Sequence, residues 1–324
     1  MNNPVRWGII GCGNVTEVKS GPGLQKADGS ALVAVMRRDG DKARDYAERH
    51  NVPRWYDDAD ALIADGDVDA VYIATPPDSH LEYTQRVAAA GKPVYVEKPM
   101  ARTGDECQLM VKACDDAGVP LFVAYYRRAL PIHDKVRSLL ADGAIGTPRF
   151  CTVRHVGAFG PGASGWRVVA DVAGRGGLFH DLASHQLDLL DYLLGPIEPA
   201  GGIGTNLAGH YDCHDTVTAA WQHAGGVAGA GMWCFVADSG QQSEDIEIGG
   251  TRGRLGFTAF ALDQPVRLQQ GDDVREFPIP PPEHVQQPLI QTVVNDLLGR
   301  GTCASTGASG LRTARAMDRF LGIG

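Results

Sequence analysis

The stretch GIIGCGNVT, residues 8–16, places Gly11 and Gly13 immediately after the apolar run Val5–Ile10. In a dinucleotide-binding loop the first glycine allows a tight turn, and the second lets the backbone approach a pyrophosphate. A third small residue lets the following helix pack against the strand. Thr16 occupies that third place, where glycine or alanine is usual, and an ordinary tight turn would use the same two glycines. The position of the loop between a strand and a helix favours dinucleotide binding. Its predicted cofactor contacts are Gly11, Gly13, Asn14 and Val15.

Short apolar runs alternate with helical patterns over the first 124 residues. Strands are predicted at Val5–Ile10, Ala31–Met36, Ala70–Ala74, Pro93–Glu97 and Leu121–Tyr125, and helices at Asp41–His50, Ala59–Ala64, Asp78–Ala90 and Thr103–Ala117. Nearly continuous apolar strands separated by amphipathic helices predict a doubly wound α/β domain, residues 1–124, with a parallel sheet covered on both faces. The sequence SGPG at Ser20–Gly23 is expected to end the first helix early.

The pattern changes after Arg128. Helices are predicted at Pro131–Asp142, His180–Leu194 and Gly310–Leu321, and strands at Arg149–Gly157, Thr216–Gln222, Val227–Phe235, Glu244–Ile248, Arg254–Phe257 and Val266–Gln269. Consecutive strands at hairpin spacing predict an α+β domain, residues 125–324, with a large, mostly antiparallel open sheet. The proline-rich stretch Pro278–His284 is expected to be an extended connector.

Composition narrows the class of protein. A length of 324 residues favours two domains, and a net charge of −9 without a basic cluster argues against nucleic acid or an anionic membrane as partner. No apolar run is long enough to span a membrane, and the N-terminus has no secretory pattern. The seven cysteines are scattered and form no C-x-x-C pair, so we expect a cytoplasmic protein without a disulfide framework or a metal site.

The segment VAVMRRDGDKA lies where a ribose-binding acid is expected, about 20 residues after the glycine loop. Arg37 and Arg38 are found there, and two guanidinium groups suit the 2′-phosphate of NADP. Alternatively, the arginines are solvated charges and Asp39 takes the role of the acid. We therefore predict NADP in preference to NAD.

Two further motifs follow predicted strands. Carboxyl ends of parallel strands line the crevice where ligands bind. IATPPDSH, Ile73–His80, therefore offers Thr75, Pro76 and His80 as cofactor contacts, although a turn with Asp78 or Ser79 capping the next helix is also natural. VYVEKPM, Val94–Met100, brings Glu97 and Lys98 to the same edge.

The glycine loop, ATPPDSH, EKP and GGLFHDLASHQLD occur in an order that resembles the glucose–fructose oxidoreductase/inositol dehydrogenase (Gfo/Idh/MocA) family, over essentially the whole chain. The resemblance implies a Rossmann domain, a second domain with an open sheet, and NAD(P)-dependent oxidation or reduction of sugars and polyols. It also implies that Lys98 is catalytic and that the Lys98–Pro99 bond is cis.

In HDLASHQLDLLDYLLG, a helix would place Asp181, His185 and Asp188 on one face, with a buried stripe of Leu182, Leu189 and Leu193. Asp181 could simply favour the helix dipole and His185 could be a core histidine. The resemblance assigns them as the catalytic Asp and His. A metal site at His180, Asp181 and His185 is disfavoured because the first two are neighbours that face different directions.

Two aromatic–arginine pairs match family positions at the expected substrate site: Tyr126 with Arg127, and Trp166 with Arg167. Each pair either contacts substrate or is a buried aromatic residue with an arginine on its rim. HYDCHD, His210–Asp215, is predicted to be a loop before a strand rather than a metal site.

These features together predict a dehydrogenase in which Lys98 stabilises the reacting oxygen, His185 carries the hydroxyl proton and Asp181 orients it. Two alternatives remain: a regulator that binds nucleotide without chemistry, and an enzyme that uses tightly bound NAD for transient oxidation coupled to elimination or glycoside cleavage. An exposed face of the second sheet would need a cover, so a homodimer or homotetramer through that sheet is expected.

Overall fold

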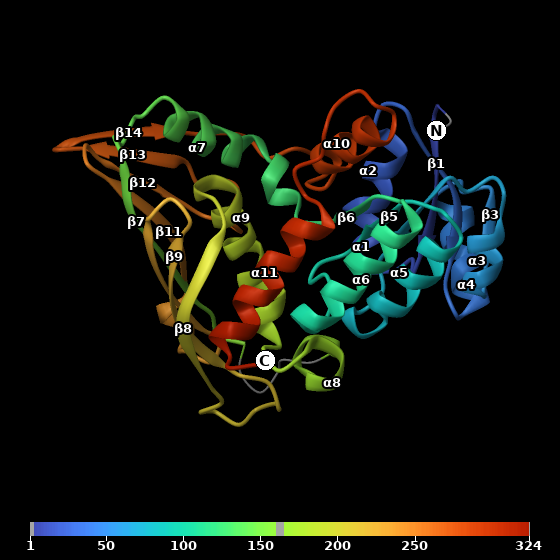
Figure 1. Ribbon diagram of the computed structural model, residues 1–324, viewed down its shortest axis with the longest axis horizontal. Helices are drawn as coiled ribbons and strands as arrows, with labels where there is room; N and C mark the ends of the chain where they lie inside the picture. The colour runs from blue at the N-terminus through green and yellow to red at the C-terminus, as the bar shows by residue number, and fades with distance from the viewer. Residues whose placement is uncertain (1–2, 160–164, 324) are drawn as a thin grey trace. The chain divides into compact units, whose positions relative to one another are not determined.

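Six parallel strands form the N-terminal sheet in the order β3-β2-β1-β4-β5-β6 (Figure 1). The computed structural model describes residues 3–159 and 165–323. The strands are β1 Val5–Ile10, β2 Ser30–Met36, β3 Arg54–Tyr56, β4 Ala70–Ile73, β5 Val94–Val96 and β6 Leu121–Val123. Every residue of β4, β5 and β6 is buried, which is typical of a parallel sheet covered on both faces. The predicted doubly wound sheet is confirmed; β3 was not predicted because its sequence, RWY, is not an apolar run and none of its residues is buried.

Helices connect these strands. They are α1 Asn14–Val18, α2 Ser20–Lys26, α3 Gly40–Arg49, α4 Ala59–Ala64, α5 His80–Ala89 after the 3₁₀ turn η1 Pro77–Ser79, and α6 Gly104–Ala117. The first helix does end early, at Val18, but SGPG then begins α2 instead of forming an irregular break. Proline is tolerated in the first turn of a helix. Gly21 is needed there because a Cβ would lie 2.2 Å from the carbonyl oxygen of Thr16.

The second sheet has eight strands in the order β14-β13-β12-β11-β7-β10-β9-β8. They are β7 Pro148–Val156, β8 Ile197–Thr205, β9 Thr216–His223, β10 Ala228–Cys234, β11 Ser243–Gly250, β12 Arg254–Phe257, β13 Val266–Gln270 and β14 Asp273–Phe277. Among the strands that the structure describes in this sheet, only β7 and β10 pair in parallel, so the mostly antiparallel prediction is confirmed. Both unpredicted strands, β8 and β14, lie at the sheet edges, where β8 is rich in glycine and β14 in charged residues, compositions that β-propensity disfavours.

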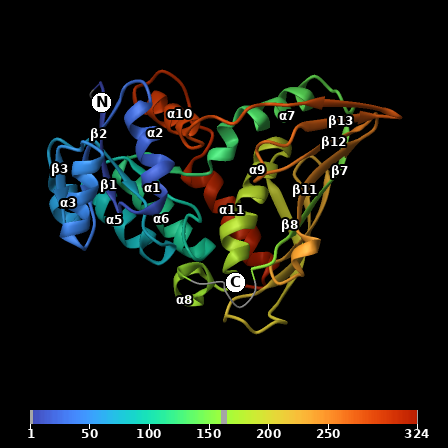
Figure 2. The ribbon, with the colours of Figure 1, turned by 180° about the vertical axis from the view of Figure 1, so that it is seen from behind.

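Helices cover one face of this sheet, as Figures 1 and 2 show for α9 Ser184–Leu194 and α11 Gly307–Phe320. Trp233 Nε1 in β10 donates to Gln186 Oε1 in α9 at 2.7 Å, and the rings of Trp221 and Phe320 lie 5.8 Å apart. The other helical segments are the 3₁₀ turns η2 Tyr126–Ala129, η3 Trp166–Val168 and η5 Ser239–Gln241, the π-helical turn η4 Phe179–Ala183, and α7 Pro131–Ala141, α8 Ala170–Ala173 and α10 Gln287–Leu297. The connector before α10 has no regular structure from residue 278 to 282.

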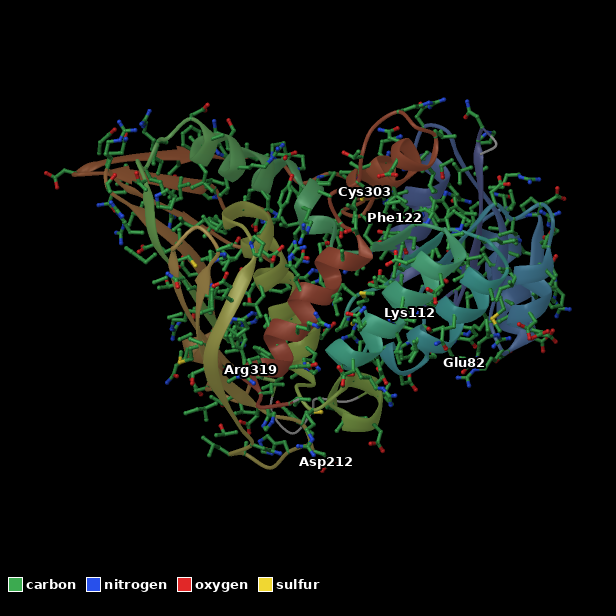
Figure 3. All side chains as sticks on the ribbon, in the orientation of Figure 1. Glu82, Lys112, Phe122, Asp212, Cys303 and Arg319 are labelled. Carbon is green, nitrogen blue, oxygen red and sulfur yellow. The ribbon has the colours of Figure 1, made fainter. Side chains whose placement is uncertain are left out.

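The chain divides into two compact units. The first comprises the described residues up to Ala101, Asp105–Ala129 and Pro282–Leu311, and the second comprises Arg102–Gly104, Leu130–Pro281 and the described residues from Arg312. The segment 282–311 joins the first unit through an antiparallel bridge from Thr306 to Phe122 of β6, and Ser305 Oγ donates to the Val123 carbonyl oxygen at 2.7 Å. Figure 3 labels Phe122 of β6 and Cys303 of the segment 282–311. This grouping differs from the single boundary expected after residue 124, which remains a prediction.

Candidate active site

The predicted cofactor residues follow the carboxyl ends of neighbouring strands in the first unit. Beyond β1 and β4, the Gly11 amide donates to the Met36 carbonyl at 2.9 Å and the Glu97 amide to the Ile73 carbonyl at 2.8 Å. Gly11, Arg37, Thr75 and Lys98 therefore lie at one edge of the sheet, and the order reverses there between β1 and β4. A crevice at such a reversal is the usual ligand site of a doubly wound sheet.

The glycine loop fits a dinucleotide. Gly11 has φ +92°, and a Cβ at this position would lie 2.7 Å from Thr75 Cγ2, so only glycine suits the turn. A Cβ on Gly13 would meet only the Gly11 carbonyl oxygen at 3.9 Å, which leaves this backbone open to an incoming group. Asn14 is exposed and Val15 half-buried.

Thr16 at the third small position has a structural reason. Its hydroxyl donates to the Gly13 carbonyl at 2.8 Å and accepts from the Gly13 amide at 3.0 Å. The side chain is fully buried, and Tyr46 Oη donates to the Thr16 carbonyl at 2.9 Å. The hydroxyl therefore fixes the loop from within the chain, so the departure from Gly or Ala is accommodated.

The two arginines after β2 are exposed. Neither forms an ion pair with a carboxylate within residues 3–159 and 165–323, and Arg37 Nη1 makes only a long hydrogen bond of 3.4 Å to the Cys12 carbonyl. Asp39 is engaged instead, since it caps α3 by accepting from the Lys42 amide at 3.2 Å and pairs with Lys42 Nζ at 2.8 Å. The Lys42 hydrogen bonds lower the pKa of Asp39.

His80 joins the two motifs at the carboxyl edge. It is fully buried; Nε2 lies 2.8 Å from the Thr75 carbonyl oxygen, and Nδ1 lies 3.1 Å from those of Pro99 and Met100. Burial lowers the pKa of His80, and the backbone carbonyls oppose that shift. Its described contacts are internal, which makes it a brace for the loop that carries Thr75 and the exposed Pro76.

The alternative assignment of Ser79 as a helix cap is correct in position, since Ser79 occupies the N-cap position of α5, but its side chain makes no capping hydrogen bond. Its hydroxyl donates to Thr75 Oγ1 at 2.8 Å. Ser79 thus orients Thr75, one of the predicted cofactor contacts.

Lys98 is half-buried directly after β5, and the Lys98–Pro99 bond is cis, as the resemblance implied. The preceding Glu97 is 7% exposed. Its carboxylate accepts from Tyr72 Oη at 2.6 Å, Gln286 Nε2 at 2.8 Å and the Lys98 amide at 3.0 Å. Two of these donors are side chains that hold the carboxylate, and the third is the Lys98 amide. Glu97 therefore anchors the backbone of Lys98.

Tyr126 and Arg127 lie in η2, after β6. Both are buried, with 7% and 3% exposed, and the Arg127 guanidinium lies 4.8 Å from the Tyr126 ring centroid. An exposed rim position for Arg127 is therefore wrong.

In the second unit, Trp166, Arg167 and Asp181 come together. Arg167 Nε donates to Asp181 Oδ2 at 2.7 Å, and the guanidinium lies 4.5 Å from the Trp166 ring centroid. Asp181 is in the π-helical turn η4, not in the regular helix expected, and π-helical turns are frequent at functional sites. The predicted leucine stripe is correct for Leu189 but not for Leu182 and Leu193, which are half-buried.

His185 is 3% exposed in the first turn of α9, with its ring edge-on to Phe260 at 5.9 Å. The next residue, Gln186, donates to Glu244 Oε1 at 2.9 Å, and Glu244 also accepts from the Phe260 amide at 3.2 Å. Phe260 in turn lies 5.3 Å from the His155 ring. These contacts fix the position of Phe260, the aromatic residue that packs against His185.

Sequence reasoning missed Gln186, Glu244, His155 and Phe260. His155 and Glu244, with Phe159, line a hollow of about 390 Å³ beside β7 and the start of β11. A histidine at a buried position near the end of β7 was the available signal. The lining of the hollow combines polar side chains, including Gln242 and Ser243, with the aromatic ring of Phe159.

The remaining predictions concern the loop His210–Asp215, the cysteines, a metal site and a membrane span. His210–Asp215 lies in the loop between β8 and β9. None of the seven cysteines, all of which lie within the described residues, forms a disulfide bond. Across the described ranges 3–159 and 165–323, no three His, Cys, Asp or Glu side chains gather as metal ligands. Within the same residues, no helix is long and apolar enough to cross a membrane.

A glycine loop at the switch point of a parallel sheet, with a lysine at the end of a nearby strand, defines a dinucleotide-binding α/β protein. Residues 5–125 match the model of the oxidoreductase family with an NAD-binding Rossmann fold, and residues 133–256 match the Gfo/Idh/MocA C-terminal domain. The chain belongs to the Gfo/Idh/MocA family of oxidoreductases.

Two curated relatives cover nearly the whole chain. Oxidoreductase P35 of Formosa agariphila is 36% identical over 99% of this chain and 100% of its own length. The 1,5-anhydro-D-fructose reductase of Ensifer adhaerens is 28% identical over 94% of this chain and 92% of its own. The protein is therefore an NAD(P)-dependent oxidoreductase.

Solved structures share the fold. An Agrobacterium radiobacter oxidoreductase in complex with NAD⁺, L-tartaric acid and magnesium has a TM-score of 0.86 at 22% identity, covering 98% of this chain and 95% of that one. KijD10, a 3-ketoreductase from Actinomadura kijaniata in complex with NADP and TDP-benzene, has a TM-score of 0.84 at 24% identity, covering 98% and 97%. At these identities the likeness shows the shared fold, and the NAD-binding character comes from the family model that matches residues 5–125.

Proposed function

We propose that this protein transfers a hydride between nicotinamide C4 and a hydroxyl-bearing or carbonyl carbon of a sugar, a polyol or a related small molecule. The bound cofactor supplies the hydride chemistry, while the chain supplies orientation and proton handling. The observation that carries the proposal is the fixed position of Lys98 after β5, where Glu97 holds its backbone amide at the ligand-binding edge of the sheet.

Each residue has a separate task. The Lys98 ammonium binds the reacting oxygen and stabilises negative charge that develops on it. His185 takes the hydroxyl proton in oxidation and returns it in reduction. Asp181, whose carboxylate Arg167 orients at 2.7 Å, binds a substrate hydroxyl or orients His185. Trp166, Tyr126 and Arg127 are proposed as further substrate contacts.

The relatives favour a hydroxylated substrate. One is a reductase named for an anhydro sugar. The hollow beside β7 offers polar groups together with the aromatic face of Phe159, a combination that suits a sugar-like molecule. The alternatives, a regulator without chemistry or an enzyme of transient oxidation and elimination, are not favoured by relatives that are named as oxidoreductase and reductase.

The cofactor preference is proposed to be NADP. Exposed Arg37 and Arg38 can both pair with a 2′-phosphate, whereas Asp39 is held by Lys42 and is poorly available to a ribose hydroxyl. The open backbone at Gly13 accommodates the pyrophosphate.

The outer face of the second sheet supports a homo-oligomer. Phe150 and Met232 are 41% and 36% exposed on neighbouring strands β7 and β10. On the side of β10 and β9 their neighbours on this face include alanines and threonines, whereas Arg154, Asp245 and Glu247 place charges on β7 and β11. We propose that a second copy covers it, as a homodimer or as part of a homotetramer. We also propose the cytoplasm as its location, because the seven cysteines are scattered along the sequence and form no C-x-x-C pair.

Absorbance at 340 nm tests the function directly. A panel of sugars, polyols and their keto forms is incubated with NADP(H) or NAD(H), and we expect turnover with at least one member. Lys98→Met keeps the volume of the stem and should lower kcat by about 100-fold or more while sparing cofactor affinity. Lys112→Met, on the exposed face of α6, is the matched control. Turnover by Lys98→Met at the wild-type rate would contradict the assignment of Lys98.

A further inference from the structure

Lys98 depends on a residue from a distant part of the chain. We propose that Gln286 is a positioning residue for Lys98 and acts through the buried carboxylate of Glu97. This inference rests on the proposed catalytic role of Lys98, and it assigns the segment before α10 a part in the reaction.

The two oxygens of Glu97 have different partners. Oε1 accepts from Gln286 Nε2 at 2.8 Å and from Tyr72 Oη at 2.6 Å. Oε2 accepts from the backbone amide of Lys98 at 3.0 Å. Gln286 and Tyr72 therefore hold the carboxylate in one orientation. The carboxylate in turn holds the backbone amide of Lys98, just after the end of β5. A buried carboxylate needs such donors because it has lost its water.

Gln286 is itself firmly placed. It is 1% exposed and lies 189 positions from Glu97 in the sequence. The helix it precedes, α10, packs closely on α2, since a Cβ on Gly23 would lie 2.7 Å from Ile290 Cδ1. Lys26 of α2 also pairs with Glu283 at 3.1 Å. The segment 282–311 therefore carries Gln286 to Glu97 as part of the first unit.

The amide is retained at a cost. Gln286 Oε1 is buried and has no hydrogen-bond partner among residues 3–159 and 165–323. An apolar side chain would avoid this unsatisfied oxygen, and a flipped amide would bring oxygen against the carboxylate. The Gln286 amide therefore leaves its oxygen unsatisfied while its nitrogen donates one hydrogen bond to Glu97. A donor kept under these conditions points to a requirement for the charge and orientation of Glu97.

Gln286→Leu removes the donor and nearly keeps the volume. We expect kcat to fall about 10-fold or more, with the Kd for NADP within about twofold of wild type. Gln291→Leu is the matched control, because this side chain on the same helix donates to the Asp28 carbonyl at 3.0 Å and is not bonded to Glu97. Tyr72→Phe removes the other donor to Oε1 and should lower kcat in the same direction.

Gln286→Glu separates positioning from a purely structural role. It sets a second carboxyl group against Glu97, so that a proton shared by the two restores the hydrogen bond at low pH. The other titratable groups around Glu97 are Tyr72, Tyr95, His80 and Lys98. Burial raises the pKa of both tyrosines and lowers that of His80. All four groups are present in wild type as well, so we compare the two proteins. We expect the ratio of Gln286→Glu to wild-type kcat to rise as pH falls.

Four outcomes are decisive. Wild-type kcat in Gln286→Leu, while Lys98→Met is inactive, would overturn the inference and leave the proposed function intact. A kcat loss shared equally by Gln291→Leu, or a pH-independent ratio for Gln286→Glu, would also overturn it. Normal turnover in Lys98→Met would instead contradict the proposed function.

Discussion

Arg167 donates from Nε to Asp181 Oδ2 over 2.7 Å, and the two side chains differ in exposure, at 48% for Arg167 and 7% for Asp181. A half-exposed arginine thus reaches a nearly buried carboxylate and sets its rotamer. The Arg167 guanidinium also lies 4.5 Å from the Trp166 ring centroid. Two residues expected to bind substrate separately therefore form one unit, and the orientation of Asp181 depends on Arg167.

Replacing Arg167 should affect activity more than stability. In Arg167→Ala, Asp181 loses the donor that orients it, and we expect kcat/KM to fall about 10-fold or more. Because the arginine is half-exposed and solvent screens the pair, the loss of unfolding free energy should be about 1 kcal/mol or less. Arg167→Lys keeps the charge but not the planar donor, and should recover only part of the activity. Steady-state kinetics and denaturant unfolding measure both. Arg137→Ala, which breaks an exposed pair with Asp134, is the control.

The preference for NADP should reside in Arg37 and Arg38. Replacing both with Ala should weaken NADP binding by about 10-fold or more, since charge-assisted hydrogen bonds contribute about 1.5–3 kcal/mol each. NAD binding should change little because NAD has no 2′-phosphate. Titration of each cofactor against both proteins tests this. Equal losses for the two cofactors, or a wild-type preference for NAD, would contradict it.

His185 should govern the pH dependence of turnover. Histidine ordinarily changes charge between about pH 5 and 8, and oxidation needs the neutral imidazole. The rate of oxidation should therefore rise with pH, and that of reduction should fall. His185→Asn keeps hydrogen-bonding capacity but cannot carry the proton. It should therefore lower turnover and remove this dependence of the rate on pH. An unchanged profile would make His185 a core residue and Lys98 the proton carrier.

Acid stability should depend on Glu17. Arg49 donates to both carboxylate oxygens at 2.8 and 2.9 Å, and with His50 it lowers the pKa of Glu17 to about 2. A lowered folded-state pKa stabilises the protein above the ordinary value of about 4.5, and this stabilisation disappears as pH falls toward 2. Glu17→Gln should therefore cost about 1 kcal/mol at pH 7, after allowance for solvent screening, and progressively less below pH 4.5.

Denaturant unfolding from pH 7 down to pH 3 measures that difference. Asp41→Asn is the control, because Asp41 is 87% exposed in its pair with Arg44. A constant difference between Glu17→Gln and wild type over this range would show that charge on Glu17 is not the source of the stabilisation.

The sequence by itself was sufficient for the parallel character of the first sheet, the mostly antiparallel character of the second, and the positions of Gly11, Thr75 and Lys98 after their strands. Apolar periodicity and glycine placement are local properties, and they act over a few residues. The edge strands β8 and β14 were missed because glycine and charge obscure the alternation there. The helix break before α2 was foreseen, but its helical continuation through SGPG depends on the close approach of Thr16 to Gly21.

Only the tertiary structure determined the partners of the site residues. Gln286 meets Glu97 across 189 positions, and Arg167 meets Asp181 across 14. Neither pair has a pattern in the sequence, because a buried hydrogen bond depends on how separate segments pack and not on spacing. A glutamine before a helix or an arginine after a tryptophan fits many surroundings. Burial in the folded protein determines which partner each side chain has, because a carboxylate removed from water must accept hydrogen bonds from donors within the fold.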